Sequence, residues 1–138
     1  MNTFNSFQSS SVQPLQQVVN LYVKLADSAF NDPYYVFYSD ESLTTEYGYT
    51  LNLKHKYVIH GTDGINSTHP FFISDNGYGN TSTNKVIIES TASATSGISG
   101  TGSTITLTFS GLATTDTLIY FCTNHSSMQK AFALSYGA

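Results

Sequence analysis

The sequence predicts an all-β fold, an antiparallel Greek-key β-sandwich, and three observations support this class. Short apolar runs bounded by Gly, Asn, Asp and Ser recur along the chain, as in sandwiches built from many short strands. The run Thr104–Phe109 alternates polar and apolar residues, which is typical of a strand with one face on a core and one in solvent. No run has a sustained helical period. With 138 residues, 40% of them hydrophobic, the chain is long enough for one domain with a sizeable core.

The first expected element is a polar arm. Residues 1–17 are rich in Ser, Gln and Asn, with Pro14 near their end, a composition typical of a terminal segment outside the packed core. We therefore expect an N-terminal arm over residues 1–17 and a single domain over residues 18–138.

Nine strands are expected in that domain, each enriched in β-branched or aromatic residues and bounded by turn formers. They are Val18–Leu25, Tyr34–Tyr38, Tyr47–Leu53, Tyr57–His60, Phe71–Ser74, Val86–Glu89, Thr104–Phe109, Leu118–Cys122 and Ala131–Leu134. Between the first two, Asp27–Asn31 has room for one helical turn, which ends before Pro33 because the residue before proline disfavours helical geometry. Two segments made of turn formers, Asp75–Asn80 and Ser90–Ser103, are expected to be surface loops. For Asp75–Asn80 a simple turn between strands is favoured, and the alternative is a loop that flanks a metal site beside His69.

The charge pattern excludes several kinds of partner. Only 10% of the residues are charged, none is arginine, and the five lysines are scattered along the chain. Nucleic-acid binding needs a basic surface, which a net charge of −4 without a lysine cluster does not supply. No apolar stretch reaches the length of a membrane span, and the N-terminus lacks the basic and apolar regions of a signal peptide. We expect no nucleic-acid or membrane partner, and a location in the cytoplasm of the producing cell or in a virion.

One motif carries most of the chemistry: Cys122-x2-His125-x2-Met128, at the end of the predicted strand Leu118–Cys122. A short loop of this spacing returns a thiolate, an imidazole and a thioether to one point, and His69, at the start of another strand, is a fourth candidate. Two imidazoles, one thiolate and a weak axial thioether are the ligands of a blue-copper site. The alternative is that Cys122 is a small buried hydrophobe and Met128 fills the core. We favour one copper ion, because these residues occur together at this spacing.

Other candidate sites are weaker. His55 and His60 are expected to face solvent or to form structural hydrogen bonds. The glycosylation sequons at Asn66, Asn80 and Asn124 are interpreted as chance products of a composition rich in Asn, Ser and Thr. Neither a catalytic triad nor a phosphate-binding glycine loop can be argued from the spacings, so we predict no catalytic residue and do not expect an enzyme.

From Tyr49 onward the chain resembles the cupredoxins, the blue-copper superfamily. The similar segments are Tyr49–Leu53, Lys56–Ile59 and Thr104–Cys122, together with the Cys-x2-His-x2-Met loop. More narrowly, the chain resembles cupredoxin-like domains of marine bacteriophage structural proteins, in which a Tyr-rich strand, this loop and an upstream His-Pro-Phe recur.

The resemblance implies a Greek-key sandwich of the cupredoxin type. It also implies that His69, Cys122, His125 and Met128 are the ligands of one copper ion. Such loops usually place glycine just after the methionine, where this chain has Gln129. Because glycine adopts positive φ more easily than other residues, the exit from the loop is expected to differ.

Two functional hypotheses remain open. The first is a structural protein of a virion or another assembly, built on a cupredoxin-like domain with a type 1-like copper site, whose partners are other subunits or copies of itself. The missing export signal, the polar arm and the arginine-free composition favour it. The alternative is a soluble blue-copper protein that transfers one electron to a redox partner. A carrier should present an apolar patch around its exposed histidine, whereas an assembly subunit should form obligate contacts through its arm and edge strands.

Overall fold

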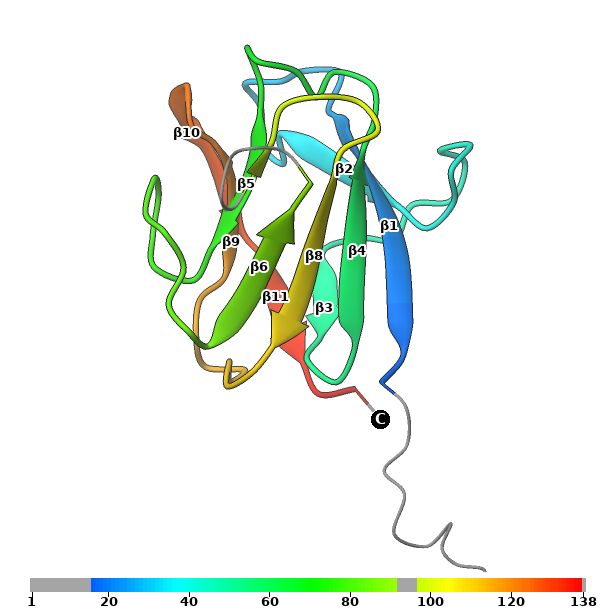
Figure 1. Cartoon of the computed structure of the whole chain (residues 1–138). Coiled ribbons are helices and arrows are strands. Elements are labelled where there is room, and N and C mark those ends of the chain that lie inside the picture. Colours follow the sequence, from blue (N-terminus) through cyan, green and yellow to red (C-terminus); the bar gives the residue numbers. More distant parts are fainter. Residues whose placement is uncertain (1–15, 92–96, 138) are drawn as a thin grey trace, which may run out of the picture.

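Eleven strands in three sheets form the part of the chain that the structure, a computed structural model, describes: residues 16–91 and 97–137 (Figure 1). In chain order they are β1 (Val18–Leu25), β2 (Tyr35–Tyr38), β3 (Thr50–Asn52), β4 (Lys56–Gly61), β5 (Phe71–Ser74), β6 (Val86–Ser90), β7 (Gly97–Ile98), β8 (Thr104–Phe109), β9 (Ile119–Cys122), β10 (His125–Ala131) and β11 (Ala133–Ser135). Most of the predicted arm, residues 1–15, lies outside the described residues.

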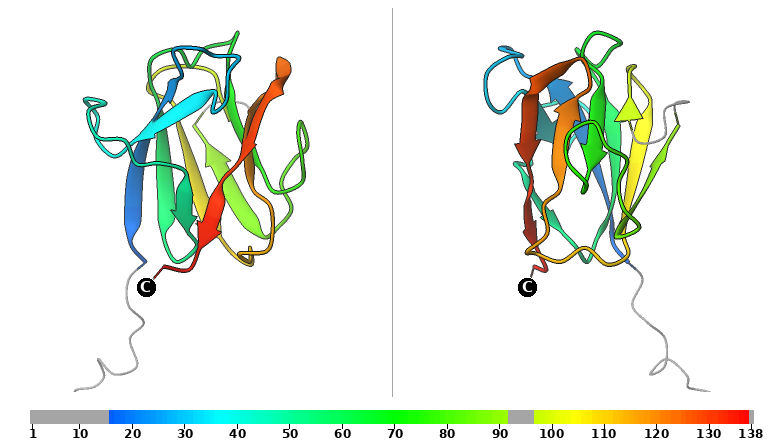
Figure 2. Two further views of the ribbon diagram at one scale, coloured as in Figure 1. Left: turned by 180° about the vertical axis from the view of Figure 1, so that it is seen from behind. Right: turned by 90° about the vertical axis from the view of Figure 1, so that its left-hand side faces the viewer.

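Two larger sheets face each other across the core, as Figures 1 and 2 show. One sheet has the strand order β2-β1-β4-β8-β6, the other has the order β10-β9-β5-β7, and β11 and β3 form a short third sheet. Most neighbouring strands are not consecutive in the chain, as in Greek-key topologies. Most pairs run antiparallel, although β1 pairs with β4 and β3 pairs with β11 in parallel. The predicted all-β, mainly antiparallel sandwich is confirmed.

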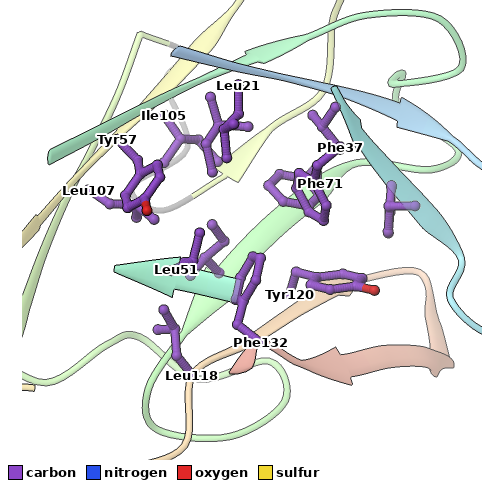
Figure 3. Packing of buried hydrophobic residues seen from close by; sticks show 14 of the residues in the cluster. Leu21, Phe37, Leu51, Tyr57, Phe71, Ile105, Leu107, Leu118, Tyr120 and Phe132 are labelled. Atoms are coloured by element: carbon purple, nitrogen blue, oxygen red, sulfur yellow. The ribbon is translucent and has the colours of Figure 1, made fainter. Parts of the chain in front are cut away.

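The core follows from the period-two alternation of the strands. Tyr57 and Ile59 of β4, and Ile105 and Leu107 of β8, are fully buried, and half-buried residues alternate with them. Figure 3 shows three of them, Tyr57, Ile105 and Leu107, facing Phe71 and Tyr120 of the opposite sheet. Burial of each such side chain contributes about 1.5–3 kcal/mol to the free energy of folding.

Aromatic side chains pack closely where the four-stranded sheet meets the five-stranded sheet. Phe37 of β2 contacts Phe71 and Tyr120 edge to face, with ring centroids 5.6 and 5.3 Å apart, a favoured aromatic geometry. Phe71 lies two residues after His69, and Tyr120 lies two residues before Cys122. Two of the predicted ligands therefore adjoin a tightly packed part of the core.

The strand predictions were correct for β1, β5 and β8 and shifted at the ends of most other strands. The predicted strand Ala131–Leu134 is divided between the last residue of β10 and the first two of β11, because the chain passes from one sheet to another at Phe132. Residues 125–128, expected in a loop, belong to β10. The predicted surface loop Ser90–Ser103 contains the buried strand β7, while its residues 92–96 lie outside the described residues. Within the described part of the chain, no helix is long and apolar enough to cross a membrane.

Candidate metal centre

The pairing of β5 with β9 brings His69 to Cys122. These strands run antiparallel, with Phe72 opposite Phe121. The start of β5 therefore lies beside the end of β9. His69 precedes β5 by two residues, and Cys122 is the last residue of β9, so the two side chains come from neighbouring strand ends.

A tight hairpin adds His125 to this pair. Thr123 and Asn124 form the turn, and His125 pairs directly with Cys122 across the ladder. Directly opposed residues of antiparallel strands project from the same face of the sheet. The Nδ1 atom of His125 lies 3.4 Å from the Sγ atom of Cys122. The ring centroids of His69 and His125 are 4.9 Å apart.

The donor atoms of these three residues fit one metal ion. One donor atom each from His69, Cys122 and His125 lies within 4.8 Å of the other two. Bonds of about 2.0–2.3 Å keep the donors of one ion within about 4 Å of one another, so binding needs movements of less than about 1 Å. The Nδ1 atom of His69 is buried without a hydrogen-bond partner, although buried polar atoms are nearly always paired. A metal ion would satisfy this nitrogen, and a thiolate with two imidazoles suits copper.

The environment of His69 favours the form that binds a metal. Burial lowers the pKa of its imidazole, and the neighbouring His125 lowers that pKa further. Metals bind the neutral imidazole, in competition with protons. His69 therefore stays ready to bind a metal at a lower pH than an exposed histidine would.

Met128, the fourth predicted ligand, follows an irregularity in β10. His125 pairs with Cys122, whereas Gln129 pairs with Phe121, so residues 126–128 bulge out of the ladder. The first two residues of the bulge are exposed, and Met128 is fully buried in the core cluster. The structure brings the other three predicted ligands together, and the axial role of Met128 stays a prediction.

Two asparagines fix the backbone around the ligands. The Oδ1 atom of Asn66 accepts hydrogen bonds from the backbone N–H groups of Thr68 and His69, both at 2.9 Å. The Nδ2 atom of Asn124 donates to the carbonyl oxygens of Ser67 at 2.8 Å and Thr68 at 3.0 Å. Asn124 thereby ties the hairpin turn to the loop that carries His69.

Two tyrosine hydroxyls donate hydrogen bonds to the backbone just before β5 and at the end of β9. The hydroxyl of Tyr35 donates to the carbonyl of Pro70 at 2.5 Å, and the hydroxyl of Tyr78 donates to the carbonyl of Cys122 at 2.6 Å. Desolvation, followed by the proximity of Cys122, raises the pKa of both phenols. Both tyrosines therefore remain neutral hydrogen-bond donors at neutral pH.

An aromatic ring lies against both imidazoles. The ring of Phe30 meets His69 and His125 edge to face, with centroid distances of 5.7 and 5.0 Å and interplanar angles of 71° and 84°. Phe30 is 59% exposed, whereas Cys122 is fully buried. From solvent inward, the order is therefore phenyl ring, imidazoles and thiol.

The other histidines lie away from this group. The Nε2 atom of His60 is 2.9 Å from Oδ1 of Asn20, and its ring stacks on Tyr22 with centroids 4.6 Å apart. The expected structural role of His60 is therefore confirmed. His55 lies beside the ring of Tyr57, and its Nδ1 atom is buried without a hydrogen-bond partner.

Sequence reasoning missed several residues that surround the centre. Tyr78 belongs to Asp75–Asn80, for which a simple turn was favoured over a loop beside the site, and its bond to the carbonyl of Cys122 supports the second alternative. Asn124 was noticed only as a sequon, although its place inside the Cys-x2-His spacing was a usable signal. Phe30 and Tyr35 had no local signal, because the fold alone brings them to the ligands.

The comparisons with known proteins assign no family to this chain. No family model and no curated protein matches the chain. Similar solved structures are a multicopper oxidase from Campylobacter jejuni (TM-score 0.42, 6% identity), a multicopper oxidase from Pediococcus acidilactici (0.41, 11%) and a laccase from Pediococcus acidilactici (0.40, 11%). They cover 95%, 94% and 94% of this chain, which spans only 32%, 28% and 29% of theirs. At these identities and TM-scores, the likeness assigns no activity to this chain.

Proposed function

We propose that this chain is a cupredoxin-like copper protein that holds one ion through His69, Cys122 and His125 and exchanges single electrons. The cluster of His69, Cys122 and His125, in which one donor atom of each residue lies within 4.8 Å of the other two, carries the proposal. Bound copper would supply one-electron redox chemistry. Met128 is proposed as the weak axial ligand.

The residues of the chain have distinct tasks in this proposal. Cys122 gives up its thiol proton when it binds the metal, and His69 and His125 bind as neutral imidazoles. The side chains of Asn66 and Asn124 hold the ligand backbones through hydrogen bonds that do not involve the metal. Such fixed ligands suit electron exchange, because they limit rearrangement between oxidation states. We therefore propose a redox carrier site rather than an enzyme active site.

A copper titration tests the proposal. We expect an intense visible absorption band, characteristic of a copper–thiolate bond, when Cu(II) is added to the purified protein, with an end point at one ion per chain. The band should vanish in Cys122→Ser and persist in His60→Gln, because His60 bonds Asn20 instead of a donor of the site. In Met128→Leu the band should shift while binding is retained. A wild-type protein that shows no such band and retains no copper would refute the proposal.

The structural role in a virion or another assembly, and the narrower likeness to bacteriophage proteins, stay predictions. One observation favours contacts with further chains. β6 is an edge strand of the five-stranded sheet and carries Ile87, which is 48% exposed, and open edge strands are surfaces for pairing. Light scattering tests this role: self-association that Ile87→Lys abolishes would support it, whereas a monomer at every concentration would favour the soluble carrier.

A further inference from the structure

The loop between β1 and β2 presents Phe30 at the tip of a defined turn. The backbone N–H of Asn31 donates to the carbonyl of Ser28 at 3.0 Å, which places Phe30 at a central position of the turn. The Nδ2 atom of Asn31 also donates to the hydroxyl of Ser28 at 2.9 Å. A second turn follows, closed by the N–H of Tyr34 and the carbonyl of Asn31 at 2.9 Å.

The same loop is attached to the two strands that carry Cys122 and His125. The hydroxyl of Tyr120, in β9, donates to the carbonyl of Pro33 at 2.8 Å. The ammonium group of Lys130, in β10, forms an ion pair with Asp32 at 2.9 Å. These contacts on successive loop residues set the position of the loop relative to the ligand strands. The ring at its tip is therefore held in register with the imidazoles.

The position of Phe30 distinguishes it from an ordinary exposed apolar residue. Single apolar side chains on a surface are normal and need no explanation. Phe30, however, contacts both imidazoles edge to face, and the thiol behind them is fully buried. A phenyl ring has no donor or acceptor for the metal, so its effect there is to exclude water and other small ligands.

We propose that Phe30 is a shield that closes the metal centre to external ligands. The inference rests on the proposed copper function and adds to it that small anions and water do not reach the metal from the solvent side. Electrons then pass through the ligand side chains without an external molecule binding at the centre. By blocking small ligands, Phe30 would favour electron exchange at the metal over the binding of external molecules.

The metal-free protein provides the first test, through the alkylation rate of Cys122 by iodoacetamide. In the native state, Phe30→Ala should raise this rate roughly tenfold or more, because thiol reactivity follows access. Phe30→Leu, which keeps part of the cover, should give a smaller rise. Tyr136→Ala removes an aromatic side chain that is 51% exposed and directly follows β11, which pairs with β3, and should leave the rate unchanged. Equal rates in wild type and Phe30→Ala would overturn the proposal.

The copper-loaded protein provides the second test, with sodium azide as the external ligand. Azide should leave the visible spectrum of the wild type unchanged and produce a new charge-transfer band in Phe30→Ala. A wild type that binds azide as tightly as the variant would also overturn the shield. Failure of the wild type to take up copper would refute the proposed function instead, and the alkylation rates would still decide whether Phe30 covers the thiol.

Discussion

Replacing Asn124 by alanine should weaken copper binding in addition to its modest effect on the stability of the fold. The side chain donates two hydrogen bonds, at 2.8 and 3.0 Å, that join the hairpin turn to the His69 loop. Both bonds are exposed, so their joint net contribution to stability is about 1–2 kcal/mol. Residues that orient metal ligands typically change metal affinity 10- to 100-fold when removed. We expect copper affinity to fall about tenfold, which corresponds to roughly 1.4 kcal/mol.

Gln16→Ala is the control for Asn124→Ala. The Nε2 atom of Gln16 also donates to an exposed backbone carbonyl, that of Lys54 at 3.3 Å, and this bond holds no part of the proposed site. Competition against a chromophoric chelator measures copper affinity, and urea unfolding of the metal-free proteins measures stability. Unchanged copper affinity in Asn124→Ala, or an equal loss in both variants, would refute the reasoning that this bridge positions the ligands.

Three further predictions concern the surroundings of the site. Tyr35→Phe removes a buried hydrogen bond to Pro70 and should lower the free energy of unfolding by about 1–3 kcal/mol in urea titrations, with Tyr136→Phe as an exposed control. The fold lowers the pKa of His69, so as the pH falls below about 6.5 the imidazole is protonated more readily in the unfolded chain than in the folded one. The free energy of unfolding of the metal-free protein should therefore decrease in this pH range. The decrease should be smaller in His69→Gln, which lacks the titrating group. Gly97→Ala would place a Cβ atom 2.5 Å from the ring of Phe72, whereas the Cβ atom of Gly100→Ala would have its nearest neighbour 3.9 Å away. Gly97→Ala should therefore lower the free energy of unfolding by about 1–3 kcal/mol in thermal or urea unfolding, and Gly100→Ala should lower it much less.

Much of the fold could be predicted because alternation is a local signal. Thr104–Phe109 shows its buried and exposed faces in six consecutive letters, and β8 has those same bounds. The buried strand β7 gave no such signal, because it is two residues long and is defined only by its pairing with Phe71 and Phe72 of β5. The parallel pairing of β1 with β4 was equally invisible, since it joins segments that are far apart in the sequence.

The residues of the candidate site also fall into those that local spacing predicts and those that only the fold brings together. Cys122 and His125 could be placed together from spacing, because a two-residue turn makes them a direct cross-strand pair. His69 could be proposed only as a histidine at the start of another predicted strand, because its distance from Cys122 is set by the β5–β9 register. Phe30 could not be predicted, since its position depends on contacts between its loop and residues about 90 positions later in the chain, Tyr120 with Pro33 and Lys130 with Asp32.

The hydrogen bonds and the ion pair that position the site join protein groups to one another and do not involve a metal ligand atom. The His69 loop is held by Asn66, Asn124 and Tyr35, the Cys122 end by Tyr78, and the Phe30 loop by its contacts with β9 and β10. The ligands are therefore positioned by the fold before any ion binds. Under the proposed function, ligands fixed in this way would move little between the two oxidation states of copper, which favours rapid electron exchange. The same rigidity means that removal of the ion should leave the backbone in place, with the unpaired nitrogen of His69 as the main local cost.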